Sequence, residues 1–125
     1  MQILVIDDEP GILRMLTFSL ERLGHEVIGA SDATVAQARF DPDRTGLIML
    51  DIMLPGMDGL SLCRQWREAG VQIPIILLTA RDEQFAGEYA AAGATDWVQK
   101  PCSLHDLLAP VHRHSSLLEQ AKRET

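Results

Sequence analysis

Short runs of apolar residues alternate along the chain with longer segments in which apolar residues recur every three or four positions. The short runs predict strands buried on both faces, and the longer segments predict amphipathic helices that cover them. Strands are expected at residues 3–6, 26–30, 47–50, 75–78 and 95–98. Helices are expected at about residues 10–23, 32–40, 60–69, 84–92 and 103–120. This alternation is typical of βα units built around a parallel sheet.

Residues that begin or end helices support these boundaries. Three of the helices are followed by a glycine, namely Gly24, Gly70 and Gly93, and glycine readily takes the left-handed conformation that ends a helix. Ser103 and Asp106 have the spacing of a capping box that opens the last helix. Pro110 lies inside that helix and removes one backbone hydrogen bond, so we expect a kink there.

Length, composition and charge limit the class of protein. The chain has 125 residues, of which 46% are hydrophobic and 23% charged, as expected for one soluble domain with a real core. No apolar run approaches the roughly 20 residues that span a bilayer, and no signal peptide is visible. Two cysteines without CxxC spacing favour a reducing cytoplasm. The net charge of -7 disfavours direct binding to nucleic acid.

Polar and ionisable residues stand where four of the predicted strands end. Asp7 and Asp8 follow the first strand, Asp51 the third, Thr79 the fourth and Lys100 the fifth. The carboxyl ends of parallel strands lie at one edge of the sheet, which is where ligands collect in such folds. The sequence therefore predicts that these side chains converge on one site.

Three carboxylates in one site repel one another unless a cation neutralises them. Mg²⁺ prefers oxygen ligands, so one or two carboxylates and a phosphate oxygen suit its shell. An ammonium group and a hydroxyl beside such a metal are typical of sites that clamp a transferring phosphoryl group. The chain has no GxxxxGK[ST], GxGxxG, HExxH or GxSxG motif, which removes the nucleotide-hydrolase, dinucleotide-binding, zinc-protease and serine-hydrolase classes. We therefore expect an aspartate nucleophile that is itself phosphorylated.

Four short motifs occur in order, each at the end of a predicted strand: Asp7-Asp8-Glu9, residues 51–59, Thr79-Ala80 and Lys100-Pro101. Together they resemble the receiver domain of bacterial two-component response regulators, over residues 2 to about 110. The resemblance implies an α/β fold of the flavodoxin-like (βα)₅ type, a doubly wound parallel sheet with strand order 2-1-3-4-5. Residues 1–125 would form a single receiver domain, in which residues 111–125 extend the last helix.

The resemblance also implies a role for each site residue. Asp51 would be the phosphoacceptor, and Thr79 and Lys100 would bind phosphoryl oxygens. The cofactor would be Mg²⁺, held directly by Asp8, Asp51 and the backbone carbonyl of Met53, and through water by Asp7. The Lys100-Pro101 peptide bond would be cis.

A conformational switch is implied as well, formed by Thr79 and Trp97. Phosphorylation would draw the Thr79 hydroxyl toward the phosphate and let the Trp97 ring turn inward, which would reshape the face formed by the last two helices and the strand between them. The family usually has tyrosine or phenylalanine at Trp97 and a bulkier residue at Cys102. Residues 84–92 also lack the basic pattern of receivers that dimerise through this face and carry a winged-helix domain.

The expected function is a signalling switch and not a metabolic enzyme. The phosphodonor would be a phosphohistidine of a sensor histidine kinase or phosphotransfer protein, in the cytoplasm. The output domain or protein is unknown, no membrane partner is expected, and a phosphorylation-dependent homodimer stays open. Two alternatives are a haloacid-dehalogenase-like phosphatase, which would place its nucleophile in a DxD pattern at the first strand, and an unphosphorylatable pseudo-receiver that serves only for docking.

Overall fold

The computed structural model describes residues 1–80, 86–100 and 103–124, with side chains up to residue 114. The strands are β1 (Gln2–Ile6), β2 (Glu26–Ala30), β3 (Thr45–Asp51), β4 (Ile75–Thr79) and β5 (Asp96–Gln99). The helices are α1 (Pro10–Arg22), α2 (Ala33–Arg39), α3 (Gly59–Glu68), α4 (Ala86–Ala91) and α5 (Leu104–Glu124). Strands and helices alternate strictly, as the hydrophobic pattern predicts.

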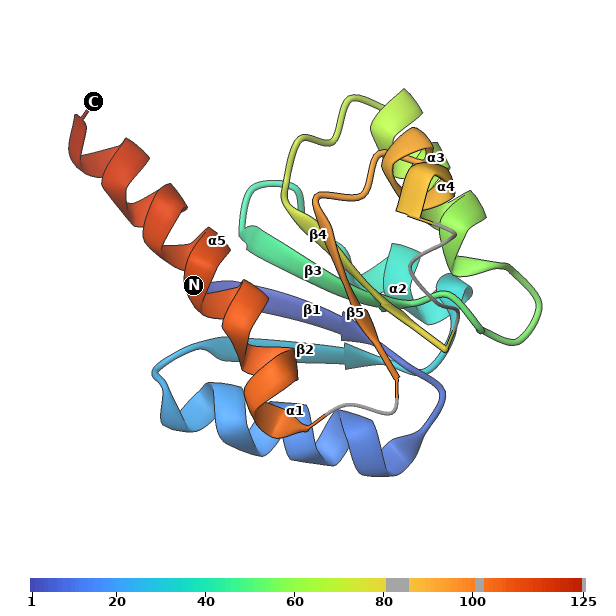
Figure 1. The fold of residues 1–125 in the computed structure, drawn as a ribbon, viewed down its shortest axis with the longest axis horizontal. Coiled ribbons are helices and arrows are strands. Elements are labelled where there is room, and N and C mark those ends of the chain that lie inside the picture. Colours follow the sequence, from blue (N-terminus) through green and yellow to red (C-terminus); the bar gives the residue numbers. More distant parts are fainter. Residues whose placement is uncertain (81–85, 101–102, 125) are drawn as a thin grey trace.

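The strands form one parallel sheet in the order β2-β1-β3-β4-β5, which confirms the predicted fold class. Helices α1 and α5 cover one face of the sheet, and α2, α3 and α4 cover the other (Figure 1). Side chains alternate between the faces along each strand: Ile3 and Val5 pack beneath α1 and α5, whereas Leu4 and Ile6 pack on the opposite side. Two hydrophobic cores therefore hold the strands rigidly in place.

The strands that carry Asp51 and Thr79 extend beyond their predicted apolar runs, and β5 keeps the predicted length but is shifted by one residue from the predicted 95–98. Asp51 and Thr79 are the last residues of β3 and β4 and not the first loop residues, because both take part in the sheet ladder, paired with Leu78 and Gln99. At the other end of the sheet, β3 already begins at Thr45, whose hydroxyl donates to the Gln2 side chain at 3.1 Å. Sheet pairing thus fixes the backbone at both site residues.

Side-chain caps set several helix ends. Asp32 caps α2 by accepting from the Val35 amide, and Ser103 and Asp106 exchange hydrogen bonds at the start of α5, which confirms the capping box. Helix α5 passes through Pro110 as one element and reaches Glu124, beyond the predicted end. A kink at the proline stays a prediction. None of the helices in the described ranges is long and apolar enough to cross a membrane.

The turn between β3 and α3 depends on Gly59, the first residue of α3. A Cβ atom at this position would overlap the carbonyl oxygen of Asp51 and lie 2.8 Å from the Cα atom of Ile52. The Gly59 amide donates to the Ile52 carbonyl at 2.8 Å, and the Asp58 side chain caps the helix. Helix α3 therefore packs directly on the backbone that carries Asp51.

Replacing Gly59 with alanine is expected to lower the free energy of unfolding by about 1–3 kcal/mol, because the added methyl group meets rigid backbone. Gly11→Ala is the matched control: Gly11 is also helical, its added Cβ would meet nothing within 4 Å, and the change should raise stability by up to about 1 kcal/mol. Urea unfolding of the three proteins measures both effects. Equal unfolding midpoints for the Gly59 variant and the wild type would contradict the close-packing argument.

Candidate functional site

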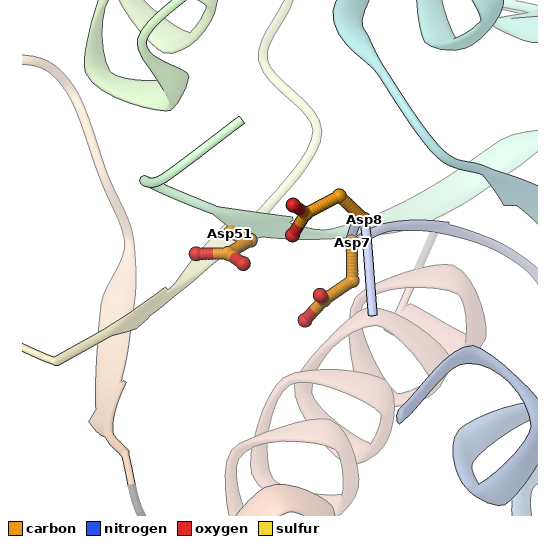
Figure 2. Close-up of side chains that lie close together, drawn as sticks. All are labelled: Asp7, Asp8 and Asp51. Atoms are coloured by element: carbon orange, nitrogen blue, oxygen red, sulfur yellow. The ribbon is translucent and has the colours of Figure 1, made fainter. Parts of the chain in front are cut away.

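Three aspartates meet at the carboxyl edge of the sheet. Asp7 and Asp8 follow β1, and Asp51 ends the neighbouring strand β3. One carboxylate oxygen from each lies within 4.8 Å of the others, and Figure 2 shows the Asp8 carboxylate pointing toward Asp51. Asp7 and Asp51 are 0% and 3% exposed, whereas Asp8 is open to solvent. The structure thus confirms that the three predicted carboxylates converge.

Lys100 joins this cluster from the end of β5, the strand at one edge of the sheet. Its ammonium group donates to Asp7 Oδ2 at 2.9 Å, to Asp51 Oδ2 at 3.1 Å and to Glu9 Oε1 at 3.2 Å. The side chain reaches from the end of β5 to the loop after β1 and is only 14% exposed. One half-buried cation therefore offsets part of the negative charge of the carboxylates.

Backbone amides fix the two buried carboxylates. The Glu9 amide donates to Asp7 Oδ1 and the Met53 amide to Asp51 Oδ1, each at 2.9 Å. Because Lys100 holds the second oxygen of each group, both carboxylates are oriented through both oxygens. Asp51 is consequently presented to ligands in a fixed direction.

The pKa values of Asp51 and Lys100 reflect burial and charge. Burial raises the pKa of Asp51 above its usual 3.8, and the charge of Asp7 adds to this rise, while the Met53 amide and Lys100 act against it. Burial alone would lower the pKa of Lys100, but the hydrogen bonds and charges of Asp7 and Asp51 outweigh this and raise it well above 10.5. Lys100 is therefore firmly protonated at neutral pH, and Asp51 is a partly desolvated carboxylate that an added cation would stabilise.

An opening in the surface gives access to this cluster. It has a volume of about 240 Å³. Its lining residues are Asp8, Glu9, Asp51, Met53, Ala80 and Lys100. The donors around it are carboxylate oxygens, which are hard ligands and suit Mg²⁺. The donor set therefore fits a divalent cation such as the predicted Mg²⁺, and two of the three clustered aspartates, Asp8 and Asp51, line the opening.

The other predicted site residues stand as follows. Thr79 is 1% exposed, and its hydroxyl lies 3.0 Å from the hydroxyl of Tyr89 on α4. Trp97 is half-buried, and its ring packs against Tyr89 with the centroids 5.7 Å apart. Met53 contacts Asp51 through its amide, and a ligand role for its carbonyl stays a prediction. Pro101, with the expected cis peptide bond, lies outside the described residues, as does Cys102.

Tyr89 is a site neighbour that the sequence pattern does not single out. It lies among small residues in the stretch 86–94, where a large side chain at helical spacing is most simply a core residue. The one available signal is that it is the only tyrosine of the chain. Its hydroxyl contact depends on how α4 packs on β4, which periodicity does not reveal.

A five-stranded parallel sheet with an acidic cluster and a lysine at its carboxyl edge is the arrangement of a receiver domain, and comparison with known sequences gives the same family. The profile of the response regulator receiver domain family matches residues 3–112, so the chain belongs to that family. It is 41% identical over 111 residues to the alkaline phosphatase synthesis transcriptional regulatory protein PhoP of Bacillus subtilis, covering 88% of this chain and 46% of PhoP. It is 42% identical over 127 residues to the response regulator MprA of Mycobacterium avium, covering 99% of this chain and 54% of MprA.

Solved structures agree with this assignment. The BeF₃-activated N-terminal receiver domain of Klebsiella pneumoniae RstA superposes with a TM-score of 0.82 at 30% identity, covering 91% of this chain and 97% of that domain. The chain spans about half the length of the curated relatives named above. The similarity therefore concerns the receiver domain of those proteins.

Proposed function

We propose that this receiver domain is a phosphorylation-controlled switch in which Asp51 accepts a phosphoryl group in the presence of Mg²⁺. The observation that carries the proposal is the cluster of Asp7, Asp8 and Asp51, two of which, Asp7 and Asp51, bind the ammonium group of Lys100. The fold brings these residues together from three strand ends, and the nucleophile, the charge clamp and the metal ligands of a phosphoryl-transfer site are all present among them.

In the proposed reaction, a carboxylate oxygen of Asp51 attacks phosphorus, and the bond between phosphorus and the histidine nitrogen of the donor breaks. The Met53 amide holds Oδ1 of Asp51 and so fixes the plane of the nucleophile. Lys100, already 3.1 Å from Oδ2, would bind a phosphoryl oxygen and stabilise its charge. Bound Mg²⁺ would supply further charge neutralisation there. The protein's contribution is thus orientation and fixed positive charge.

The proposed metal ligands are Asp8, Asp51 and the Met53 carbonyl, with Asp7 acting through water. Asp8 is exposed and free to turn toward an ion, which favours direct contact. Both oxygens of Asp7 already accept hydrogen bonds at 2.9 Å, from the Glu9 amide and from Lys100. Asp51 is hydrogen-bonded in the same way but lines the opening, whereas Asp7 is 0% exposed and is not among the lining residues. A water-mediated role therefore suits Asp7 better.

The partners follow from this chemistry. A sensor histidine kinase or a phosphotransfer protein would donate the phosphoryl group, in the cytoplasm where the ATP for the kinase is available. Phosphorylation would act through Thr79 and Trp97 on the face formed by α4, β5 and α5, where an output domain, an output protein or a second copy of the chain would bind. The relatives PhoP and MprA carry the names of a transcriptional regulatory protein and a response regulator, which supports such an output.

The phosphatase alternative is less compatible with the geometry. A haloacid-dehalogenase-like enzyme would use the aspartate at the end of β1 as its nucleophile, which is Asp7. That side chain is 0% exposed and is not among the residues that line the opening, whereas Asp51 is one of them. The accessible nucleophile is therefore Asp51.

The test is to incubate the protein with acetyl phosphate and Mg²⁺ and to measure its intact mass. We expect a gain of one phosphoryl group that EDTA prevents and that Asp51→Asn abolishes. Asp58→Asn is the matched control, because this aspartate caps α3 nearby and asparagine caps equally well, so its mass gain should persist. A wild-type protein that gains no mass would instead be a pseudo-receiver.

A further inference from the structure

Tyr89 connects the two residues of the expected switch. It is 0% exposed, its hydroxyl lies 3.0 Å from that of Thr79, and its ring packs against Trp97 at an interplanar angle of 54°. The resemblance described above couples Thr79 to Trp97 directly. In this chain a third side chain, from α4, lies in contact with both.

The Thr79 side chain faces α4. Leu77, two positions earlier on β4, packs in the core beneath α3 and α4, and the alternation of side chains along a strand puts Thr79 on the same face. The opening at Asp51 is lined by the next residue, Ala80. A turn of the Thr79 side chain into another rotamer would carry its hydroxyl away from Tyr89 and toward a phosphoryl group on Asp51.

We propose that Tyr89 is a latch: its hydroxyl holds Thr79 in the orientation of the unphosphorylated state, and phosphorylation of Asp51 releases it. This inference rests on the proposed function of Asp51. Tyr89 is a positioning residue that acts through Thr79, and it touches neither the phosphoryl group nor the metal. The Tyr89 hydroxyl and the phosphoryl group compete for a hydrogen bond with the Thr79 hydroxyl.

Because Tyr89 is fully buried, loss of its hydrogen bond to Thr79 should shift the equilibrium between the two states measurably. Breaking a buried hydrogen bond leaves its partner without water to replace the bond, which shifts a two-state equilibrium by about fivefold or more. This bias favours the unphosphorylated state until the phosphoryl contact overcomes it. Once Thr79 has turned away, the buried Tyr89 hydroxyl can find a new hydrogen-bond partner only if the Tyr89 ring or α4 moves. That movement would be transmitted to Trp97 through the contact between the two rings.

Beryllofluoride, which mimics the phosphoryl group on an aspartate, tests the latch when titrated with Mg²⁺ and followed by the ¹⁹F NMR signal of its protein-bound form. Tyr89→Phe keeps the ring and removes only the hydroxyl, so the affinity should rise about fivefold. In a Thr79→Ala background the same replacement should change the affinity by less than about twofold, because the latch acts through Thr79. Circular dichroism and urea unfolding verify that each variant is folded.

Because Tyr89 is the only tyrosine, 3-fluorotyrosine labelling gives a single ¹⁹F resonance that reports on its hydroxyl. We expect this resonance to shift on beryllofluoride binding, and in the same direction in ligand-free Thr79→Ala. An unmoved resonance, an unchanged affinity in Tyr89→Phe, or an equal gain in the Thr79→Ala background would overturn the latch. If these occur while the wild type still gains a phosphoryl group on Asp51, only the latch fails. A wild type that neither gains mass nor binds beryllofluoride overturns the proposed function as well.

Discussion

Replacing Lys100 with methionine is expected to slow phosphoryl transfer from acetyl phosphate to Asp51 by at least about a hundredfold, the usual effect of removing one aligned donor from a charged transition state. Methionine keeps the unbranched stem but has no charge. The lost group is an ammonium that contacts Asp7 and Asp51 at 2.9 and 3.1 Å. The initial rate of mass gain at saturating Mg²⁺ measures the effect.

Lys100→Arg separates charge from geometry. Arginine keeps the positive charge, but its planar guanidinium replaces a compact ammonium that meets three carboxylates from one point. We expect a rate between those of the wild type and the methionine variant. A methionine variant that reacts within threefold of the wild type would show that Lys100 has no part in the transfer.

The same replacement also affects folding, with a definite pH dependence. The pKa of Lys100 is raised in the folded state, so its ammonium contributes stability that is fully present below 10.5 and lost as the pH rises through the higher folded value. At neutral pH the methionine variant lacks this contribution and leaves Asp7 and Asp51 without their shared cation. Its free energy of unfolding should therefore fall, and Mg²⁺ should restore part of the loss, which keeps the rate measurement feasible.

Most of the fold and the centre of the site are predictable from the sequence for one physical reason. Parallel strands buried on both faces produce continuous apolar runs, and the residue that follows each run must lie at one edge of the sheet. This logic places Asp7, Asp8, Asp51 and Lys100 together before any coordinates are known. It depends only on strand direction, so small errors in the strand boundaries do not matter.

What the sequence does not reveal depends on packing between elements. The pattern places Asp51 and Thr79 just beyond their strands, because ladder pairing of the last residue is not visible in hydrophobicity. The first residue of α3, Gly59, could not be predicted because it follows a run of turn-forming residues, although Asp58 is a good cap. The contact between Tyr89 and Thr79 is hidden most completely, since it requires α4 to lie against the end of β4 at one particular depth.

Asp8 offers the sharpest test of the proposed metal site. Asp8→Asn is expected to weaken Mg²⁺ binding by about ten- to a hundredfold, or about 1.4–2.8 kcal/mol. Asparagine keeps the shape and one oxygen ligand but removes the negative charge. Asp8 is also the exposed member of the cluster, so its replacement leaves the buried hydrogen bonds of Asp7 and Asp51 intact. Isothermal titration calorimetry at fixed pH and ionic strength measures the affinity.

Glu9→Gln is the matched control, because Glu9 is an exposed carboxylate one residue further along that contacts Lys100 but lies outside the group of three aspartates. It removes the same charge from nearly the same place and should change the Mg²⁺ affinity by less than about threefold, as expected for a solvent-screened charge. Equal losses in the two variants would mean that general negative charge attracts the ion and that Asp8 is no ligand. If Asp8 is a ligand, the Mg²⁺ concentration for half-maximal phosphorylation should rise by the same factor as the dissociation constant, because in the proposed reaction only the metal-bound protein accepts the phosphoryl group.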